Sequence, residues 1–177
     1  AQQPNLTGTT NLEAYELYLQ GVNLWHLRTG ESLEAALQLF EQAIALDPGY
    51  AMAYALLGTM RIGQWRNDPA ASDAALDEAY ALTKRAVELD DGDSTCHSLL
   101  AHACLYRRAY ELALQHMCRA VEINPNNAWN RADMGLILTY TGPAEDALAW
   151  LKQAREIDPY FDPPWYWRQS GQAFMAL

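Results

Sequence analysis

Apolar residues recur along this chain with helical periodicity, and one spacing returns at intervals. An alanine is followed four residues later by a residue that is usually large and seven residues later by a second alanine, before a helix-ending residue. The pattern begins at Ala36, Ala79, Ala113 and Ala147, in steps of 43, 34 and 34 residues. Because residues seven apart share one face of an α-helix, each copy predicts a helix with a flat apolar stripe.

A second repeated feature is a small residue that lies upstream of each alanine pattern, within a separate stretch of periodic apolar residues. These positions are called the small-residue column. Its members are Gly21, Gly58, Ala101, Gly135 and Gly171. A residue with little or no side chain allows a second backbone to approach closely. Each unit is therefore predicted to be a hairpin of two helices: an A helix that carries the small residue and a B helix that carries the alanines.

Proline marks the ends of three predicted B helices. Pro48, Pro125 and Pro159 each follow an Asp or Asn, and proline disfavours the α conformation of the residue before it. Gly142 and Pro143 predict a different break, in which Gly142 takes a left-handed cap and Pro143 begins the next helix.

These signals together predict nine helices. The A helices are expected near 12–28, 50–64, 94–107, 128–141 and 163–177, and the B helices near 32–46, 73–89, 110–123 and 144–157. Repeat 2 carries an insertion at about 64–72, QWRNDPAAS. This insertion is either a loop that contacts a partner or a length change tolerated at a hairpin tip.

The combination resembles the tetratricopeptide repeat (TPR), whose 34-residue unit carries a Leu-Gly pair in helix A, an Ala and an aromatic residue in helix B, and a Pro at the exit. Leu57-Gly58 and Met134-Gly135 match the pair, with Leu100-Ala101 as a variant. The resemblance covers residues 13–177 and implies an all-α fold, a right-handed superhelix (α-solenoid) of antiparallel helical hairpins with an extra C-terminal helix. Four repeats are expected at about 14–50, 51–93, 94–127 and 128–161, with a partial fifth at 162–177. Residues 1–12 are expected to be a linker or trimmed terminus, and the chain to be part of a longer protein.

Composition narrows the possible partners. The formal charge is −10, from 22 acidic and 12 basic residues, and no stretch gathers the Lys and Arg that nucleic acid requires. No apolar run approaches the roughly 18 residues needed to cross a bilayer, so membrane insertion by this segment is not expected. The odd set of three cysteines favours a reducing compartment, hence a cytoplasmic location, with the periplasm as the alternative.

One predicted A helix gathers Cys96, His97, His102 and Cys104, residue types that zinc prefers. Helical geometry argues against a metal site. In the TPR register His97 and Cys104 share the side that faces the partner helix, whereas His102 points roughly 140° away. Core packing is the expected role, and no metal or other cofactor is expected.

Neither a calcium site nor an enzymatic activity is indicated by the remaining residues. Asp90, Asp91 and Asp93 surround Gly92 but lack the remaining ligands of a calcium loop, so a solvated turn is expected. The chain contains no G-x-S-x-G, Walker or H-E-x-x-H motif. No catalytic residue is therefore assigned, and the chain is not expected to be an enzyme.

The TPR resemblance implies a concave binding groove lined by A helices, at positions 2, 5, 9, 12 and 13 of each repeat. The candidate groove residues are Tyr15, Tyr18, Val22, Trp25, His26, Met52, Thr59, Ile62, His102, Tyr106, Trp129, Leu136, Tyr140 and Arg168, and Thr139, Trp165 and Gln172 occupy further positions of this set. Only Arg168 is charged, unlike the Lys, Arg and Asn set of TPR domains that clamp a C-terminal carboxylate.

Such a groove suits an apolar or aromatic peptide held by a few anchors. Tyr18, Trp25, Trp129 and Tyr140 are the hypothesised anchors. The alternative is that these aromatic side chains pack on one another or on the N-terminal linker.

A narrower resemblance concerns segments 14–58 and 130–167. They are similar to the C-terminal TPR regions of bacterial multidomain signalling proteins that carry a class III adenylate or guanylate cyclase domain or a winged-helix domain. This resemblance implies a regulatory module that binds a peptide or protein. The alternative is a structural element for homo-oligomerisation through the C-terminal helix, which contains Trp165, Trp167, Phe174 and Met175.

Overall fold

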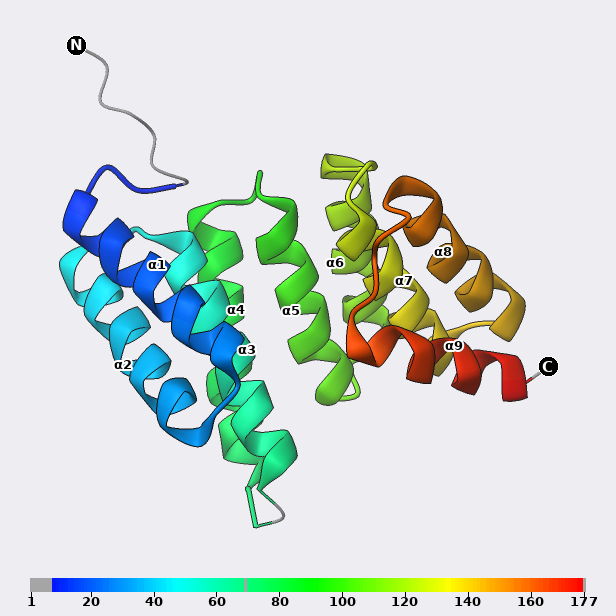
Figure 1. Ribbon diagram of the computed structural model, residues 1–177, viewed down its shortest axis with the longest axis horizontal. Helices are drawn as coiled ribbons and strands as arrows, with labels where there is room; N and C mark the ends of the chain where they lie inside the picture. The colour runs from blue at the N-terminus through cyan, green and yellow to red at the C-terminus, as the bar shows by residue number, and fades with distance from the viewer. Residues whose placement is uncertain (1–7, 69, 177) are drawn as a thin grey trace. The chain divides into compact units, whose positions relative to one another are not determined.

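A computed structural model describes residues 8–68 and 70–176, and Figure 1 shows the chain as a series of helices. The fold is all-α, with nine α-helices and no strand within the described ranges. The A helices are α1 (Leu12–Leu27), α3 (Ala51–Asn67), α5 (Ser94–Tyr106), α7 (Ala128–Thr141) and α9 (Pro164–Met175). The B helices are α2 (Gly30–Leu46), α4 (Asp73–Leu89), α6 (Tyr110–Ile123) and α8 (Ala144–Ile157).

The predicted helices are confirmed, with two informative differences in their bounds. Helix α3 continues to Asn67, so the first residues of the repeat 2 insertion extend a helix instead of forming a loop. Helix α2 begins at Gly30, ahead of the expected residue 32, because Thr29 and Ser32 form a capping box in which each side chain accepts the backbone N–H of the other.

The predicted left-handed cap at Gly142 is wrong. Gly142 has φ −136°, an extended conformation, because Pro143 follows it and disfavours helical backbone. The non-glycine residues with positive φ are instead Arg28, at 58°, and Arg108, at 59°, among the described residues. Both lie in the short turns that join the A and B helices of repeats 1 and 3.

The glycines of the small-residue column allow the A and B helices to pack closely. A Cβ built on Gly21 would lie 2.8 Å from Cε1 of Phe40 in α2. At Gly58 it would lie 2.9 Å from the Ala79 carbonyl oxygen of α4, and at Gly135 it would lie 2.6 Å from Cγ of Leu151 in α8. Real Cβ atoms do not approach other atoms this closely, so a larger residue would force the two helices apart.

The chain divides into two compact units, which separate between Asp91 and Gly92. The first contains α1 to α4, paired as α1 with α2 and α3 with α4, and α2 also packs on α3. Ala14, Ala43, Tyr50 and Ala53 form a buried cluster at one end of these helices. Asn11 caps α1 and also donates a side-chain hydrogen bond to the carbonyl of Leu46, which ties the start of α1 to the end of α2.

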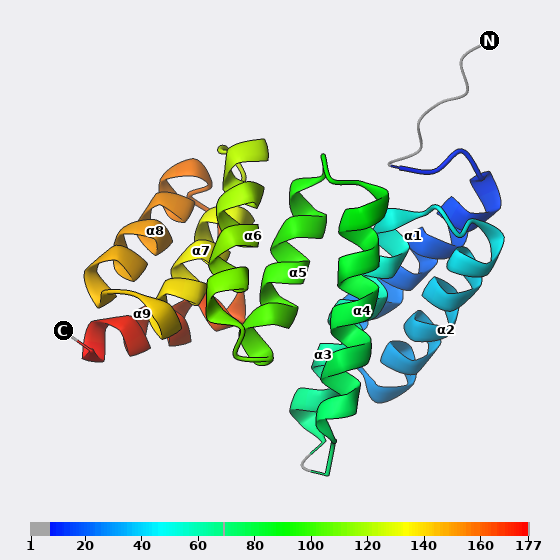
Figure 2. The same cartoon turned by 180° about the vertical axis from the view of Figure 1, so that it is seen from behind.

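The second unit contains α5 to α9, seen from the opposite side in Figure 2. Helices α5 and α6 pair, as do α7 and α8, and α9 packs on both α7 and α8. Asp93 accepts hydrogen bonds from the backbone N–H groups of Thr95 and Cys96, so one member of the predicted solvated turn serves as the N-cap of α5. At the other end of this unit, the Tyr166 hydroxyl donates to the Leu151 carbonyl at 3.0 Å and joins α9 to α8.

Two glycines of α3 provide a matched test of the helix contact. We expect Gly58→Ala to lower the free energy of unfolding by about 1–3 kcal/mol, because the new methyl group meets α4. We expect Gly63→Ala to raise it by about 0.5–1 kcal/mol, because a Cβ there has nothing within 4 Å and alanine favours the helix. Urea unfolding followed by circular dichroism measures both, and equal effects of the two changes would contradict the contact at Gly58.

Candidate functional site

In the first unit, the candidate residue Tyr18 packs within an aromatic cluster. Its ring centroid lies 5.2 Å from that of Tyr50, 5.9 Å from Phe40 and 6.4 Å from Tyr15. Met52, like Tyr18, packs against the buried cluster of Ala14, Ala43, Tyr50 and Ala53. Tyr18 is only partly exposed, so its contacts favour the alternative that some of the predicted anchors stabilise the fold.

The remaining candidates of the first unit differ in accessibility. The Trp25 ring is partly exposed, and its centroid lies 5.6 Å from that of the His26 ring and 5.2 Å from the Arg28 guanidinium. Val22 and Thr59 are also partly exposed, and the Thr59 hydroxyl donates to the Ala55 carbonyl. Ile62 is only 4% exposed, so it does not present a surface to a partner in this conformation.

In the second unit, Trp129 is accessible and stands beside other aromatic rings. Its side chain is 53% exposed, with centroids 5.0 Å from Phe161 in an edge-on arrangement and 6.3 Å from Trp165. The start of α7 is fixed by the Asn127 side chain, which accepts the Trp129 backbone N–H at 2.9 Å. Trp129 therefore lies in the first turn of a capped helix, and more than half of the residue is exposed.

A buried carboxylate joins α5 to α7 and accounts for the position of His102. Asp133 is only 5% exposed, and it accepts from the Ser98 hydroxyl at 2.8 Å and lies 3.3 Å from Nε2 of His102. Serine, histidine and aspartate do not form a catalytic arrangement here, because the carboxylate lies between the other two side chains and the histidine does not accept the serine proton. Tyr106, on the same helix as His102, is partly exposed.

Sequence reasoning missed Asp133, although a signal was present. Two residues before the small-residue column, the first three repeats carry Leu19, Leu56 and Leu99, whereas the fourth carries Asp133. An acidic residue that replaces leucine in a repeated apolar position is a sign of a buried partner.

The predicted orientations of His97 and Cys104 are consistent with the structure. Nδ1 of His97 lies 3.1 Å from Nδ1 of His116 on α6, so His97 faces its partner helix. Cys104 is buried, and the resulting desolvation raises its pKa from 9.0 to about 11, opposed in part by Arg107. Within the described residues, no group of three or more His, Cys, Asp or Glu side chains could hold a metal ion.

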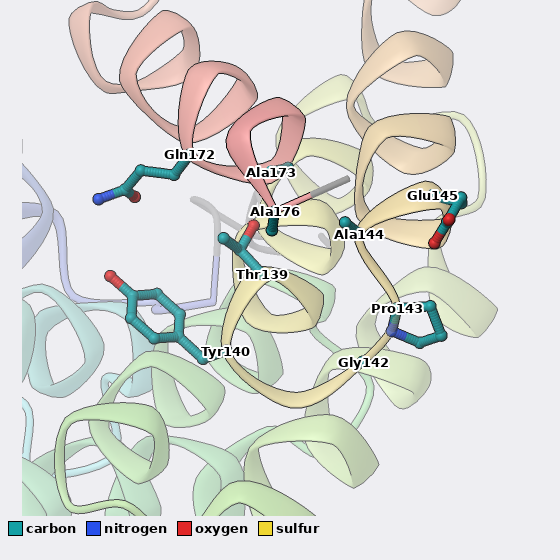
Figure 3. Close-up of a pocket in the computed structure, with 9 residues that line it drawn as sticks. All are labelled: Thr139, Tyr140, Gly142, Pro143, Ala144, Glu145, Gln172, Ala173 and Ala176. Atoms are coloured by element: carbon teal, nitrogen blue, oxygen red, sulfur yellow. The ribbon is translucent and has the colours of Figure 1, made fainter.

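An open pocket of about 580 Å³ lies where α7 ends, α8 begins and α9 passes beside them (Figure 3). Thr139, Tyr140 and Gln172, which line it, are among the groove positions predicted from the sequence. Figure 3 shows Tyr140 and Gln172 on one side of the pocket and Pro143 and Glu145 on the other. The full lining is Thr139, Tyr140, Gly142, Pro143, Ala144, Glu145, Gln172, Ala173 and Ala176.

The pocket is therefore built mainly from neutral side chains and an aromatic ring. Tyr140 is 55% exposed, and Glu145 is the one formally charged residue in the lining. Leu136, one turn earlier on α7, is partly exposed, and Arg168 on α9 is exposed but outside the lining. Of the predicted groove positions, Thr139 and Tyr140 of α7 and Gln172 of α9 are the ones that line this pocket.

No family model and no curated protein matches this sequence. Among solved structures, the chain resembles YrrB, a TPR protein with an unusual peptide-binding site, at 22% identity over 92% of this chain and 76% of YrrB, with a TM-score of 0.57. It also resembles TTC0263, a thermophilic TPR protein of Thermus thermophilus, at 17% identity over 92% of this chain and 99% of that one, with a TM-score of 0.65. MamA matches at 16% identity over 93% and 82% of the two chains, with a TM-score of 0.60. These matches establish a TPR fold.

Among the described residues, no helix is both long enough and apolar enough to span a membrane.

The buried carboxylate generates a prediction about coupling between α5 and α7. We expect Asp133→Ala to lower the free energy of unfolding by about 1–3 kcal/mol, because the Ser98 hydroxyl loses its acceptor and His102 loses the carboxylate beside its Nε2. We expect Ser98→Ala to cost about 1 kcal/mol, and the double variant to show a coupling of about 0.5–3 kcal/mol. Urea unfolding of the four proteins measures this cycle, and strictly additive effects would argue against the bond.

Burial of the thiols generates a second prediction. We expect iodoacetamide to modify Cys118 in the folded protein while Cys96 and Cys104 stay protected, because Cys118 is exposed and the other two are buried. Burial and Glu122 also raise the pKa of Cys118, so its reaction should accelerate as the pH rises above 8. Mass spectrometry counts the modified thiols, and Cys118→Ser should abolish the reaction; rapid modification of a second thiol would contradict the assignment.

Proposed function

We propose that this chain is a scaffold that binds a peptide or protein partner along the exposed A-helix positions of its second unit. The observation that carries this proposal is the pocket at Thr139, Tyr140 and Gln172, because its lining includes residues that the repeat pattern assigns to a binding face. Concave, largely apolar sites with a few convergent polar groups are typical of binding sites.

Helix α7 supplies a stripe of three side chains on one face that leads to this pocket, with the buried Ala132 and Asp133 between the first and the second. Trp129, Leu136 and Tyr140 are separated by seven and four residues, so they follow one face of the helix. At 1.5 Å per residue, the stripe is roughly 16 Å long, which matches about five residues of an extended peptide. Trp129 at one end and Tyr140 at the other are each more than half exposed, as anchors for a partner must be.

The chemistry of the stripe indicates the kind of partner. Aromatic and aliphatic side chains favour an apolar or aromatic segment, and Gln172 and Thr139 can hydrogen-bond to its backbone. Glu145 and the net charge of −10 disfavour an acidic partner. The printed description of YrrB as a TPR protein with a peptide-binding site supports the same class of ligand.

The biological role that we propose is regulatory. The resemblance of segments 14–58 and 130–167 to TPR regions of bacterial signalling proteins suggests a cytoplasmic module that controls an attached output domain when a partner binds. In this proposal the chain itself carries no catalytic residue and no cofactor. Its contribution is to present a fixed binding surface.

A peptide library displayed on phage and selected on the whole chain tests the proposal. We expect selection of peptides with two aromatic or aliphatic residues, and Tyr140→Ala to weaken their binding at least tenfold, because the ring is an anchor. Isothermal titration calorimetry measures the affinity. Tyr160→Ala is the matched control, since Tyr160 is 93% exposed and lies outside the stripe. Selected peptides that bind the Tyr140 variant as tightly as the natural sequence would refute this site.

A further inference from the structure

We propose that Gln169 of α9 determines the specificity of the partner site: its side-chain amide pairs with the amide of an Asn or Gln side chain of the partner. This role rests on the proposed function, because it concerns the same pocket. Three features of Gln169 support it. The side chain is buried, its amide has no hydrogen-bond partner among the described residues, and it lies on the face of α9 that borders the pocket.

The side chain of Gln169 is fully buried, with 0% of its surface exposed. Neither Nε2 nor Oε1 has a hydrogen-bond partner within the part of the chain that the structure describes. An amide has donors on its nitrogen and an acceptor oxygen, and a buried polar group without partners destabilises the fold. The side chain is already covered, so this lack of partners does not come from an uncovered helix face.

The position of Gln169 in the repeat makes the residue unusual. Two residues before the small-residue column, the first three repeats carry leucine, the fourth carries Asp133 and the fifth carries Gln169. Asp133 has a hydroxyl and an imidazole beside it on the preceding A helix. The same register places Ala132 and Leu136 of α7 opposite Gln169, and neither side chain can form a hydrogen bond. A polar residue that replaces leucine without gaining a partner is typical of a functional position.

The helical register of α9 places Gln169 at the inner end of the pocket. Gln169 follows Tyr166 by three residues and precedes Ala173 by four, so the three side chains share one face of the helix. Tyr166 belongs to a buried cluster that includes Leu151 of α8. Ala173 and Ala176, on the other side of Gln169, line the pocket (Figure 3). Gln169 therefore lies where the close packing of α9 ends and the pocket begins.

A change of side-chain rotamer brings the amide into the pocket. Glutamine has a long, flexible side chain, and residues four apart on a helix have Cβ atoms roughly 5–6 Å apart. Ala173, between Gln169 and the pocket, has a small side chain that the amide can pass. The buried amide makes no hydrogen bond with the described residues, so none is lost when it turns outward. Leaving the core also removes the cost of burying a polar group.

The chemistry of the amide indicates which group of the partner fits. A second primary amide offers both a donor and an acceptor, so two such groups pair through two hydrogen bonds. A carboxylate has no donor for Oε1, and a Lys or Arg side chain has no acceptor for Nε2. The main chain of a bound peptide stays nearer the mouth of the pocket than a side chain that enters it. The expected occupant of the inner end is therefore an Asn or Gln side chain.

Nuclear magnetic resonance of the whole chain tests this pairing with N-acetyl-glutamine methylamide as the probe. The side-chain amide signals of Gln169 are identified by their loss in Gln169→Met, which keeps a long, flexible side chain without the amide. We expect the probe to shift these signals saturably. We also expect it to bind Gln169→Met at least tenfold more weakly, as followed through the backbone signal of Ala173.

Two related probes separate the side chain from the main chain. N-acetyl-methionine methylamide and N-acetyl-glutamate methylamide carry the same main-chain amides, but a thioether or a carboxylate replaces the side-chain amide. Both should bind at least tenfold more weakly than the glutamine probe. Equal affinity of the three probes, or no shift of the Gln169 signals, would overturn the proposal.

Unfolding in urea gives an independent measurement on the protein alone. We expect Gln169→Leu to raise the urea midpoint, because leucine occupies this position in the first three repeats and removes a buried amide. Gln115→Leu is the matched control, since Gln115 is exposed on α6 and its replacement should leave the probe affinity unchanged. A lower midpoint for Gln169→Leu would show that the folded protein already satisfies the amide, and the proposed role would then be wrong.

The pairing and the proposed function fail in different ways. If Tyr140→Ala weakens binding of the selected peptides but the glutamine probe leaves the Gln169 signals unshifted, the pairing is wrong and the stripe on α7 remains supported. If the probe shifts these signals but Tyr140→Ala has no effect on the peptides, the pocket binds an amide and Tyr140 is not an anchor.

Discussion

The close approach of paired helices at a glycine is the contact on which the rest of each hairpin depends. At Gly58 and Gly135 the partner helix comes so near that one of its backbone carbonyl oxygens would lie only 2.9 Å from an added Cβ. This proximity sets which residues of the A helix are covered by the B helix and which turn outward. Because α8 covers the other side of α7, the side chains that end at Tyr140 are exposed. A binding surface in this fold is thus specified indirectly, by the residues that pack on the opposite side of the helix.

Most of the architecture was predictable because the repeated alanine and glycine spacings reflect the close packing of each A helix on its B helix. The three later B helices have the bounds expected from the alanine pattern, and α7 has the bounds expected from its glycine. The differences arose from local effects that a repeat pattern does not contain. Thr29 and Ser32 cap each other and lengthen α2, and Pro143 holds Gly142 in an extended conformation.

The candidate site was predictable only in part, because a position in a repeat does not reveal its neighbours. Tyr140 and Trp129 lie on the surface as expected of anchors, whereas Tyr18 packs on Phe40 of α2 and on Tyr50, the residue before α3. Both outcomes have the same sequence signature, an aromatic residue on an A helix. For Asp133, the sequence showed that an acidic residue replaces the leucine of the first three repeats, but it did not show that Ser98 and His102 lie beside it.

The distribution of the thiols has a consequence for how this protein can be studied. All three cysteines, Cys96, Cys104 and Cys118, belong to the second unit, and the first unit has none. In a fold whose repeats contact only their neighbours, separate parts can open with different free energies. The buried thiols are therefore natural probes of fluctuations in one half of the chain. Their labelling rates, compared with amide hydrogen exchange in the other half, would measure whether the two units unfold as one cooperative structure.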